Sequence, residues 1–221
     1  NLKFHGGETI GLESKQVQKE LLKALDDEGK TKIEANQVLD LEYEVPFLAH
    51  APLEPMNCTA NVTENFCEVW VPTQSQGGCM DVAKEITELD EGQIKIHTTY
   101  LGGGFGRRGE TDFVKQTLIL AKALGKPIKV TWMREEDMQH DFYRPASMSR
   151  FQIGLNKDGF PISWNNQLAS PSILKRFFAP MAWFNIDPLS TEGADDIPYA
   201  IEDFNLDYSE VDSGVPVGFW H

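Results

Sequence analysis

The stretch YLGGGFGRRGE, from Tyr100 to Glu110, constrains the fold more than any other part of the sequence. The alternating residues 93–100 before it predict a strand, and residues 111–125 after it have the apolar spacing of a helix. Its five glycines permit positive φ and let a ligand approach the backbone closely. Because N–H groups at a helix start favour an anion, we expect a cradle for a phosphate, a pyrophosphate or an oxyanionic metal centre. The alternative is a tight turn without a ligand.

Apolar periodicity predicts further helices and strands on both sides of this loop. Residues 46–60 contain three prolines and are expected to be irregular, as are residues 171–198. The elements expected are helices at 14–28 (with Ser14 as N-cap), 77–89 and 111–125; a half-buried strand at 38–45; strands at 66–73, 93–100 and 200–211; a buried strand at 128–133; and a β-hairpin at 151–169 that turns at Asn156–Gly159.

This order predicts an α+β fold with a mixed sheet and helices packed on one face. A central βαβαβ segment is followed by the β-hairpin, so parallel pairing is expected near the glycine loop and antiparallel pairing behind it. Residues 1–40 are interpreted as an N-terminal helix and connecting segment, the tail of a preceding domain. Residues 41–221 then form the domain that carries the loop.

The charge balance excludes some classes of partner. The chain has 20 Lys and Arg against 34 Asp and Glu, a formal net charge of −14, which disfavours nucleic acid. No apolar run approaches the ~20 residues that a membrane span needs. The three cysteines, Cys58, Cys67 and Cys79, lack the spacing of a zinc site, and we expect buried, reduced thiols.

Two hypotheses follow from the loop itself. Gly104–Gly109 fits the G-x-G-x-x-G pattern of a dinucleotide-binding turn, with Glu135 or Glu136 as the ribose-binding acid, so NAD or FAD is a candidate ligand. Alternatively, the loop belongs to a non-catalytic domain, and Arg107 and Arg108 contact a partner protein.

A third hypothesis comes from resemblance. The segments YEVPFLAHAPLEPMNCTA, EVWVPTQSQ, LGGGFGRRGETDFVKQ and VPVGFW occur in this order between Tyr43 and Trp220. They resemble the molybdenum-cofactor subunit of the xanthine dehydrogenase/aldehyde oxidase superfamily, and within it the isoquinoline 1-oxidoreductase β-subunit branch. Residues 41–221 would then be part of a molybdopterin-binding domain.

The resemblance implies roles for individual residues. The Gln of the Thr-Gln pair reaches the ligands of the molybdenum, and the Phe-Gly of the loop offers backbone N–H groups, which stabilise oxygen without adding charge. Arg107 and Arg108, which replace the Gly-Lys of other members, would reach a pterin phosphate or a partner subunit; the alternative is a solvated surface pair. The cofactor-binding residues expected are Gln74, Gly104, Phe105, Gly106 and Arg107.

Departures from the family pattern limit this expectation. Gly109 occupies the position of a purine-binding glutamate, with Glu110 one place later, which argues against a purine. His221 stands where the family places an arginine, and Gln76 is a second-ranked alternative to Gln74. No residue matches the family's catalytic glutamate, so no catalytic residue and no metal ligand is expected within the chain.

The resemblance therefore implies a fragment of a molybdenum hydroxylase subunit. The whole enzyme would oxidise an aldehyde or an N-heterocycle with water as the oxygen source, and a separate [2Fe–2S] subunit would accept the electrons. The isolated chain, without the remainder of its own polypeptide, would be inactive and without cofactor. Its compartment stays open between bacterial cytoplasm and periplasm.

Overall fold

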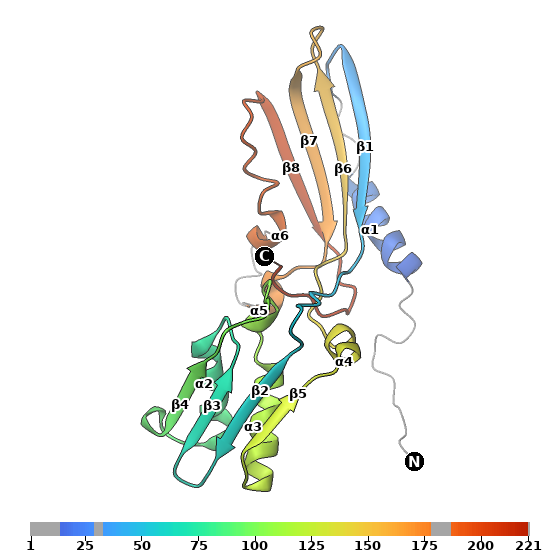
Figure 1. The fold of residues 1–221 in the computed structure, drawn as a ribbon. Coiled ribbons are helices and arrows are strands. Elements are labelled where there is room, and N and C mark those ends of the chain that lie inside the picture. Colours follow the sequence, from blue (N-terminus) through green and yellow to red (C-terminus); the bar gives the residue numbers. More distant parts are fainter. Residues whose placement is uncertain (1–13, 29–32, 178–186, 221) are drawn as a thin grey trace. The chain divides into compact units, whose positions relative to one another are not determined.

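A computed structural model describes residues 14–28, 33–177 and 187–220 (Figure 1). The chain forms two compact units, each made of two stretches: residues 1–48 and 145–217 in unit 1, and residues 49–144 and 218–221 in unit 2. The expected α+β class is confirmed, with the strands divided between two four-stranded mixed sheets. The units do not coincide with a boundary at residues 40 and 41, because the N-terminal helix packs within unit 1.

Unit 2 carries the glycine loop. Its sheet has the order β4-β3-β2-β5, in which β3 and β4 are parallel while β2 runs antiparallel to both β3 and β5. The elements of this unit are β2 (Asn57–Val62), β3 (Cys67–Val71), α2 (Gln76–Thr87), the 3₁₀ helix η1 (Glu91–Gln93), β4 (Ile94–Thr98), the 3₁₀ helix η2 (Arg107–Gly109), α3 (Asp112–Leu124), β5 (Ile128–Thr131) and α4 (Arg134–Gln139).

Two expectations for unit 2 are wrong. Residues 57–60 lie in β2 rather than in an irregular segment, because the prolines end at Pro55 and the following residues alternate between buried and partly buried. Strand β5 is not buried: it lies at the edge of the sheet, and its residues alternate between partly buried and exposed. The βαβαβ order is correct, but β2 is inserted between β3 and β5.

The hydrophobic core of unit 2 lies between its sheet and helices α2 and α3. Helix α3 contacts β2 and β5, α2 contacts β4, and the two helices contact each other. Helix α3 follows Thr111 and ends at Gly125, whose φ of 59° is the left-handed conformation that glycine adopts at a helix end. The expected burial of the free cysteines is confirmed for all three: Cys58, Cys67 and Cys79.

Unit 1 is a sheet with one helix against it. The sheet order is β1-β6-β7-β8; β1, β6 and β7 pair antiparallel, and β8 is parallel to β7. The expected hairpin is confirmed, and Asn156 Oδ1 accepts hydrogen bonds from two backbone N–H groups of its turn. The elements are α1 (Ser14–Glu28), β1 (Gln37–Val45), β6 (Ser147–Leu155), β7 (Pro161–Ser170), α5 (Leu174–Phe177), α6 (Pro188–Thr191) and β8 (Asp203–Glu210).

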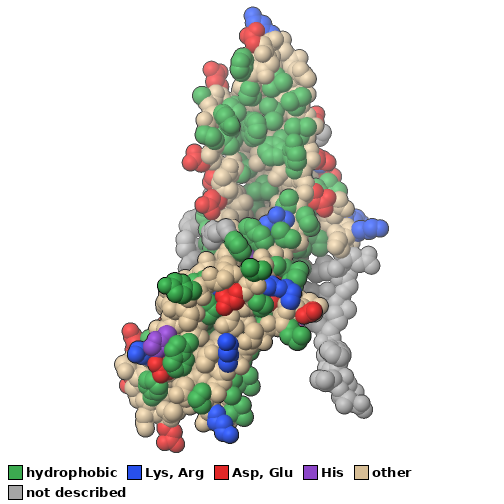
Figure 2. Space-filling view, in the orientation of Figure 1, with side chains coloured by type: hydrophobic (Ala, Val, Ile, Leu, Met, Phe, Trp, Pro, Cys, Tyr) green, Lys and Arg blue, Asp and Glu red, His purple; other side chains and the backbone are tan. Residues whose placement is uncertain are grey.

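The two faces of the unit 1 sheet differ. Helix α1 packs on one face through a buried cluster of Val17, Leu21, Leu25, Ala146, Met148 and Ala169. The aromatic side chains of Tyr43, Phe151 and Trp164 contact one another edge to face, and Tyr43 is 59% exposed. Strand β1 is exposed at all but one residue, not half-buried as expected. Figure 2 shows hydrophobic side chains gathered over the surface of these strands.

Among the described residues, no helix combines the length and the apolar character that crossing a membrane requires.

Candidate functional site

The parallel pairing of β3 and β4 brings two separate motifs to one edge of the sheet. Gln74 follows the end of β3, and the glycine loop follows the end of β4. Neighbouring parallel strands end at the same side of a sheet, where ligands commonly bind in α/β folds. Backbone bonds fix this arrangement: Thr99 N donates to Val71 O at 3.1 Å, and Gln74 N donates to Arg108 O at 2.9 Å.

The side chain of Gln74 lies directly over the loop. The Gly106 N–H donates to Gln74 Oε1 at 3.2 Å. A Cβ at Gly104 would come within 2.5 Å of the same oxygen, so only glycine leaves room for the amide there. Three of the expected cofactor-binding residues, Gln74, Gly104 and Gly106, therefore form one local arrangement.

This arrangement leaves two donor nitrogens without a hydrogen-bond partner among the described residues. In the described part of the chain, no hydrogen bond engages Gln74 Nε2 or the Phe105 N–H. Phe105 has a φ of 53°, the left-handed conformation that non-glycine residues rarely adopt, and its side chain is half exposed. The Gly106 N–H, in contrast, is engaged by Gln74, so the loop offers one free amide from this pair where two were expected.

Arg108 is fully buried and supports the loop from within. Its Nε donates to Gly103 O at 2.7 Å, one Nη donates to Pro72 O at 3.2 Å, and the other donates to Glu54 O at 2.6 Å and lies 3.0 Å from Glu54 Oε2. The planar guanidinium suits this task because its N–H groups point in fixed directions. The expectation of a solvated surface pair is wrong.

Arg107 is buried on another side of the loop. Both of its Nη atoms donate to the Asp112 carboxylate, at 2.9 and 2.8 Å, and its Nε lies 3.0 Å from Asp141 Oδ1. The rings of Trp132 and Phe142 lie 5.4 and 5.3 Å from the guanidinium carbon. The side chain is thus held by protein groups, so a partner protein cannot be bound through this guanidinium as the partner hypothesis requires.

The buried arginines and the carboxylates around the loop form a cluster of paired charges. Burial would raise the pKa of the Glu54 carboxyl, but hydrogen bonds and the charge of Arg108 hold that pKa below its ordinary value. Burial lowers the pKa of Arg108 itself, against the opposing charge of Glu54. Burial raises the pKa of Asp137, although Arg134 donates to its carboxylate at 2.6 Å. Asp137 and Asp141 are both buried, although most residues between 134 and 141 are exposed.

His50 and Asp141 are buried members of the cluster that sequence reasoning did not select. His50 Nδ1 lies 3.0 Å from each carboxylate oxygen of Asp141, and Nε2 lies 2.6 Å from Phe219 O. His50 and Glu54 do not converge, since Glu54 turns toward Arg108. The only sequence signal for the contact between His50 and Phe219 is that the VPVGFW segment, which contains Phe219, resembles the family. His221, the residue after this segment, lies outside the described residues.

The dinucleotide hypothesis is not favoured. A 3₁₀ helix, η2, separates the loop from α3, so the third glycine of the pattern does not open that helix. Strand β4 is an edge strand, and β5 pairs with β2 rather than beside β4 as a Rossmann unit requires. Glu135 and Glu136 lie on α4, not at the end of a strand beside the loop.

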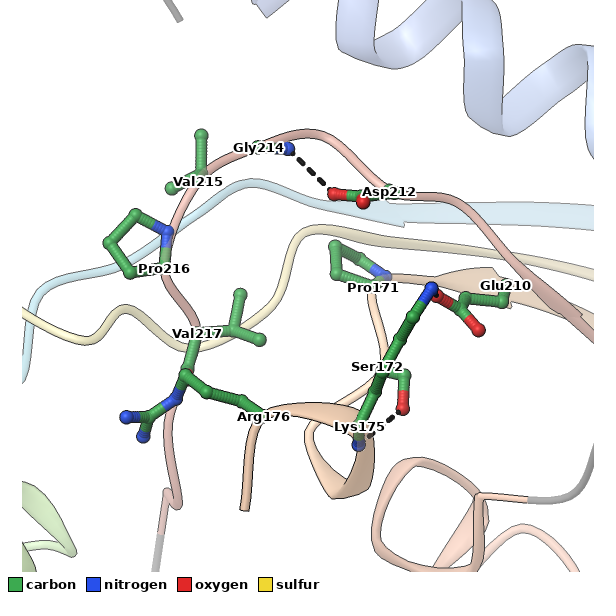
Figure 3. Close-up of a pocket in the computed structure, with 10 residues that line it drawn as sticks. All are labelled: Pro171, Ser172, Lys175, Arg176, Glu210, Asp212, Gly214, Val215, Pro216 and Val217. Atoms are coloured by element: carbon green, nitrogen blue, oxygen red, sulfur yellow. Dashed lines mark hydrogen bonds and ion pairs between the residues drawn. The ribbon is translucent and has the colours of Figure 1, made fainter. Parts of the chain in front are cut away.

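A pocket of about 270 Å³ in unit 1 contains two cationic side chains (Figure 3). The segment Gly214–Val217 curves along one side of it, and Pro171 and Ser172 lie on the other. Both cations are engaged: Lys175 Nζ lies 2.7 Å from Glu210 Oε1, and Arg176 Nε donates to Val217 O at 2.6 Å. Among the described residues, no three His, Cys, Asp or Glu side chains are grouped to hold a metal.

Comparison with known proteins agrees with the loop geometry. The molybdopterin cofactor-binding domain matches residues 15–166, more than half of the chain. The chain belongs to this family. It is 32% identical over 123 residues to the membrane-bound aldehyde dehydrogenase (pyrroloquinoline-quinone) of Gluconacetobacter polyoxogenes, which covers 55% of the chain and 16% of that protein. It is 28% identical over 144 residues to the isoquinoline 1-oxidoreductase subunit beta of Brevundimonas diminuta, covering 64% and 18%.

Solved structures share the fold. The aldehyde oxidoreductase of Desulfovibrio gigas superposes with a TM-score of 0.66 at 16% identity, over 85% of this chain and 20% of that chain. Quinoline 2-oxidoreductase of Pseudomonas putida 86 gives a TM-score of 0.66 at 15% identity, over 85% and 24%. The chain thus spans less than a quarter of the length of each of these four relatives.

Proposed function

We propose that this chain forms the cofactor-facing part of a molybdenum hydroxylase subunit. The observation that carries the proposal is the Gln74–Gly106 hydrogen bond. It fixes the Gln74 amide over the glycine loop and leaves Nε2 without an acceptor among the described residues. Beside it, the Phe105 N–H is also without a partner among the described residues. Together they form a pair of neutral donors, as a group rich in oxygen or sulfur would require.

The residues present fit a molybdenum–pterin group. Such a group brings most of its own ligands, so the protein needs to supply hydrogen bonds rather than metal-ligating side chains. When bound, it supplies the redox chemistry that removes two electrons from the substrate. Gln74 would donate through Nε2, Phe105 through its N–H, and Gly104 would leave the space that the Gln74 amide needs. The contribution of Arg107 would be to hold the loop through Asp112.

The reaction proposed is hydroxylation of an aldehyde or an N-heterocycle. The substrate carbon loses hydrogen and gains the oxygen of water, and two electrons and two protons leave. A [2Fe–2S] subunit would accept the electrons, and the remainder of the polypeptide would supply the catalytic glutamate and the rest of the cofactor pocket. Within the superfamily, we propose the isoquinoline 1-oxidoreductase type, on the four ordered segments that resemble it.

The proposal is tested on the native protein purified from its source. Subunit mass and molybdenum content should be measured together. We expect a subunit several times heavier than 24.9 kDa, with about one molybdenum per subunit. A native subunit near 24.9 kDa that lacks molybdenum would contradict the proposal.

A substitution tests the role of Gln74. In the native-length protein, Gln74→Ala should retain molybdenum but lower kcat about 100-fold, the usual effect of removing one donor to a developing oxyanion. Gln76→Ala is the matched control, since Gln76 is an exposed glutamine at the start of α2. Equal activity of both variants would remove Gln74 from the site.

A further inference from the structure

His50 lies buried between two groups that can only accept hydrogen bonds. Its side chain and that of Asp141 are each 1% exposed. Nδ1 is 3.0 Å from both carboxylate oxygens of Asp141, and Nε2 is 2.6 Å from the carbonyl oxygen of Phe219. A carbonyl has no proton to give, so Nε2 must carry the hydrogen of that bond.

Donor groups surround the Asp141 carboxylate, which favours its ionised form. His50 N donates to Oδ2 at 2.5 Å, Phe142 N donates to Oδ1 at 2.7 Å, and Arg107 Nε lies 3.0 Å from Oδ1. Burial would raise the pKa of Asp141, but the side-chain and backbone hydrogen bonds from His50, with the charges of His50 and Arg107, hold that pKa below its ordinary value. Because a carboxylate without a proton can only accept, His50 Nδ1 must also carry a hydrogen.

The surroundings of the ring suit an imidazole with two N–H groups. The Trp220 ring lies 4.6 Å from the His50 ring, at an angle of 31°. A protonated imidazole beside an aromatic face gains cation–π attraction. The charged groups around the ring are Asp141, with Arg107 behind it, and Arg144, whose guanidinium carbon lies 5.9 Å from the Trp220 ring.

The Phe219 carbonyl that His50 holds presses against the glycine loop. A Cβ at Gly106 would collide with Phe219 O, and Gly106 has a φ of 98°, so only glycine passes under this carbonyl without strain. Gly106 N–H in turn donates to Gln74 Oε1. His50, Phe219, Gly106 and Gln74 therefore form a continuous chain of contacts that ends at the free Gln74 amide.

We propose that His50 is a positioning residue of the candidate site, protonated on both ring nitrogens, that links Asp141 to the Phe219 carbonyl and so holds Gly106 beneath Gln74. The two ring protons of His50, and the contact by which Phe219 holds Gly106, are inferred from contacts within unit 2. Their consequence for a cofactor rests on the proposed function.

The test uses nitrogen-15 NMR of histidine-labelled chain at neutral pH. Both ring nitrogens of His50 should give the similar shifts of an imidazolium, with each ring proton resolved. His97 is the internal comparison, because its Nε2 meets Glu68 at 2.6 Å while the ring stacks on Trp70. A single ring proton on His50 would overturn the proposal, whatever the native protein's molybdenum content turns out to be.

Two variants separate positioning from general stability. His50→Gln cannot span both acceptors, so we expect the Gly106 amide to exchange with solvent about 10- to 100-fold faster. Asp141→Asn keeps the shape and offers an amide donor to Nδ1, so His50 should lose its Nδ1 proton yet retain most of the Gly106 protection.

The variants also define how the proposal fails. The proposal would be overturned if the Gly106 amide exchanged at the wild-type rate in a folded His50→Gln protein. It would also be overturned if both ring nitrogens of His50 kept their protons in Asp141→Asn. If His50→Gln does not fold, the wild-type spectrum and the Asp141→Asn protein still decide. Absence of molybdenum from the native protein would overturn the proposed function, but not the inference that His50 holds the Phe219 carbonyl against Gly106.

Discussion

The two units differ in the proportion of charged groups among their buried polar side chains. Unit 2 buries charged groups, Arg107, Arg108, Asp137 and Asp141, and ties them to one another or to backbone carbonyls around the glycine loop. The central strands of unit 1 bury one charged residue, Arg150, and otherwise uncharged polar residues: Gln152, Ser163, Asn165, Asn166, Gln167 and Ser170. A buried ion pair requires defined geometry to offset desolvation, so it fixes direction as well as position. Unit 2, which concentrates these buried ion pairs, is also the unit whose loop holds the neutral Gln74 amide.

The largest effect is expected from Arg108→Met. The side chain volume is largely kept, but four carbonyl groups and the Glu54 carboxylate lose their donor. Leaving buried polar groups unpaired should lower the free energy of unfolding of unit 2 by about 3–5 kcal/mol. Denaturant titration followed by hydrogen exchange in β2 and β3 would measure it. The exposed pair Lys115–Glu85 is the control, since Lys115→Ala should cost under about 1 kcal/mol.

The next effect should come from Leu21→Ala in unit 1. Leu21 is 1% exposed and belongs to a buried cluster of six residues, so its loss leaves a cavity that few neighbours can fill. We expect about 2–4 kcal/mol of destabilisation, seen as faster exchange in β6 and β7. Leu22, which is only partly buried beside that cluster, is the matched control. Equal losses at both leucines would mean that α1 does not pack as described.

Asp141→Asn should change how unit 2 responds to acid. The native pKa of Asp141 lies below that of the unfolded chain, so its stabilisation is present above about pH 4 and is lost as the pH falls through the native pKa. The variant should therefore be less stable by about 2 kcal/mol at neutral pH and show a flatter stability curve below pH 4. Urea midpoints from pH 7 to pH 3 would measure this. A parallel downward shift at every pH would contradict the assignment.

The smallest effect is expected from Tyr43→Thr on β1. Tyr43 is 59% exposed, and threonine keeps the preference for a strand. The free energy of unfolding should change by less than about 0.5 kcal/mol, in contrast to substitutions at the buried face of the same sheet. A larger loss, measured by the same titration, would show that the Tyr43–Phe151 ring contact contributes to the core of unit 1.

Local patterns allowed much of the fold to be predicted. The helices and the hairpin follow from apolar spacing and turn residues within a few positions of one another, as at Thr111, Gly125 and Asn156. The pairing of Gln74 with the glycine loop was also accessible, because a parallel βαβ connection brings both strand ends to one edge. These features depend on short stretches of sequence.

The remaining features depend on contacts that are distant in sequence. The insertion of β2 beside β5 and the burial of Arg107 and Arg108 are set by partners that periodicity does not reveal. Arg107 was expected to bind the cofactor, and the sequence does not show that Asp141, from a separate segment, lies beside it. His50 likewise had no local signal, since its acceptors lie 91 and 169 residues away.

That last separation also sets an order of events during synthesis. Ribosomes add about 5–20 residues per second, so the Phe219 carbonyl emerges roughly 10–30 s after His50, whose Nε2 it will accept a hydrogen bond from. Strands β2 to β5 can pair in that interval, but Gly106 lacks its contact with Phe219 until the whole second stretch of unit 1 has been made. The loop is therefore shaped by one stretch of unit 2 and closed by another that is translated later.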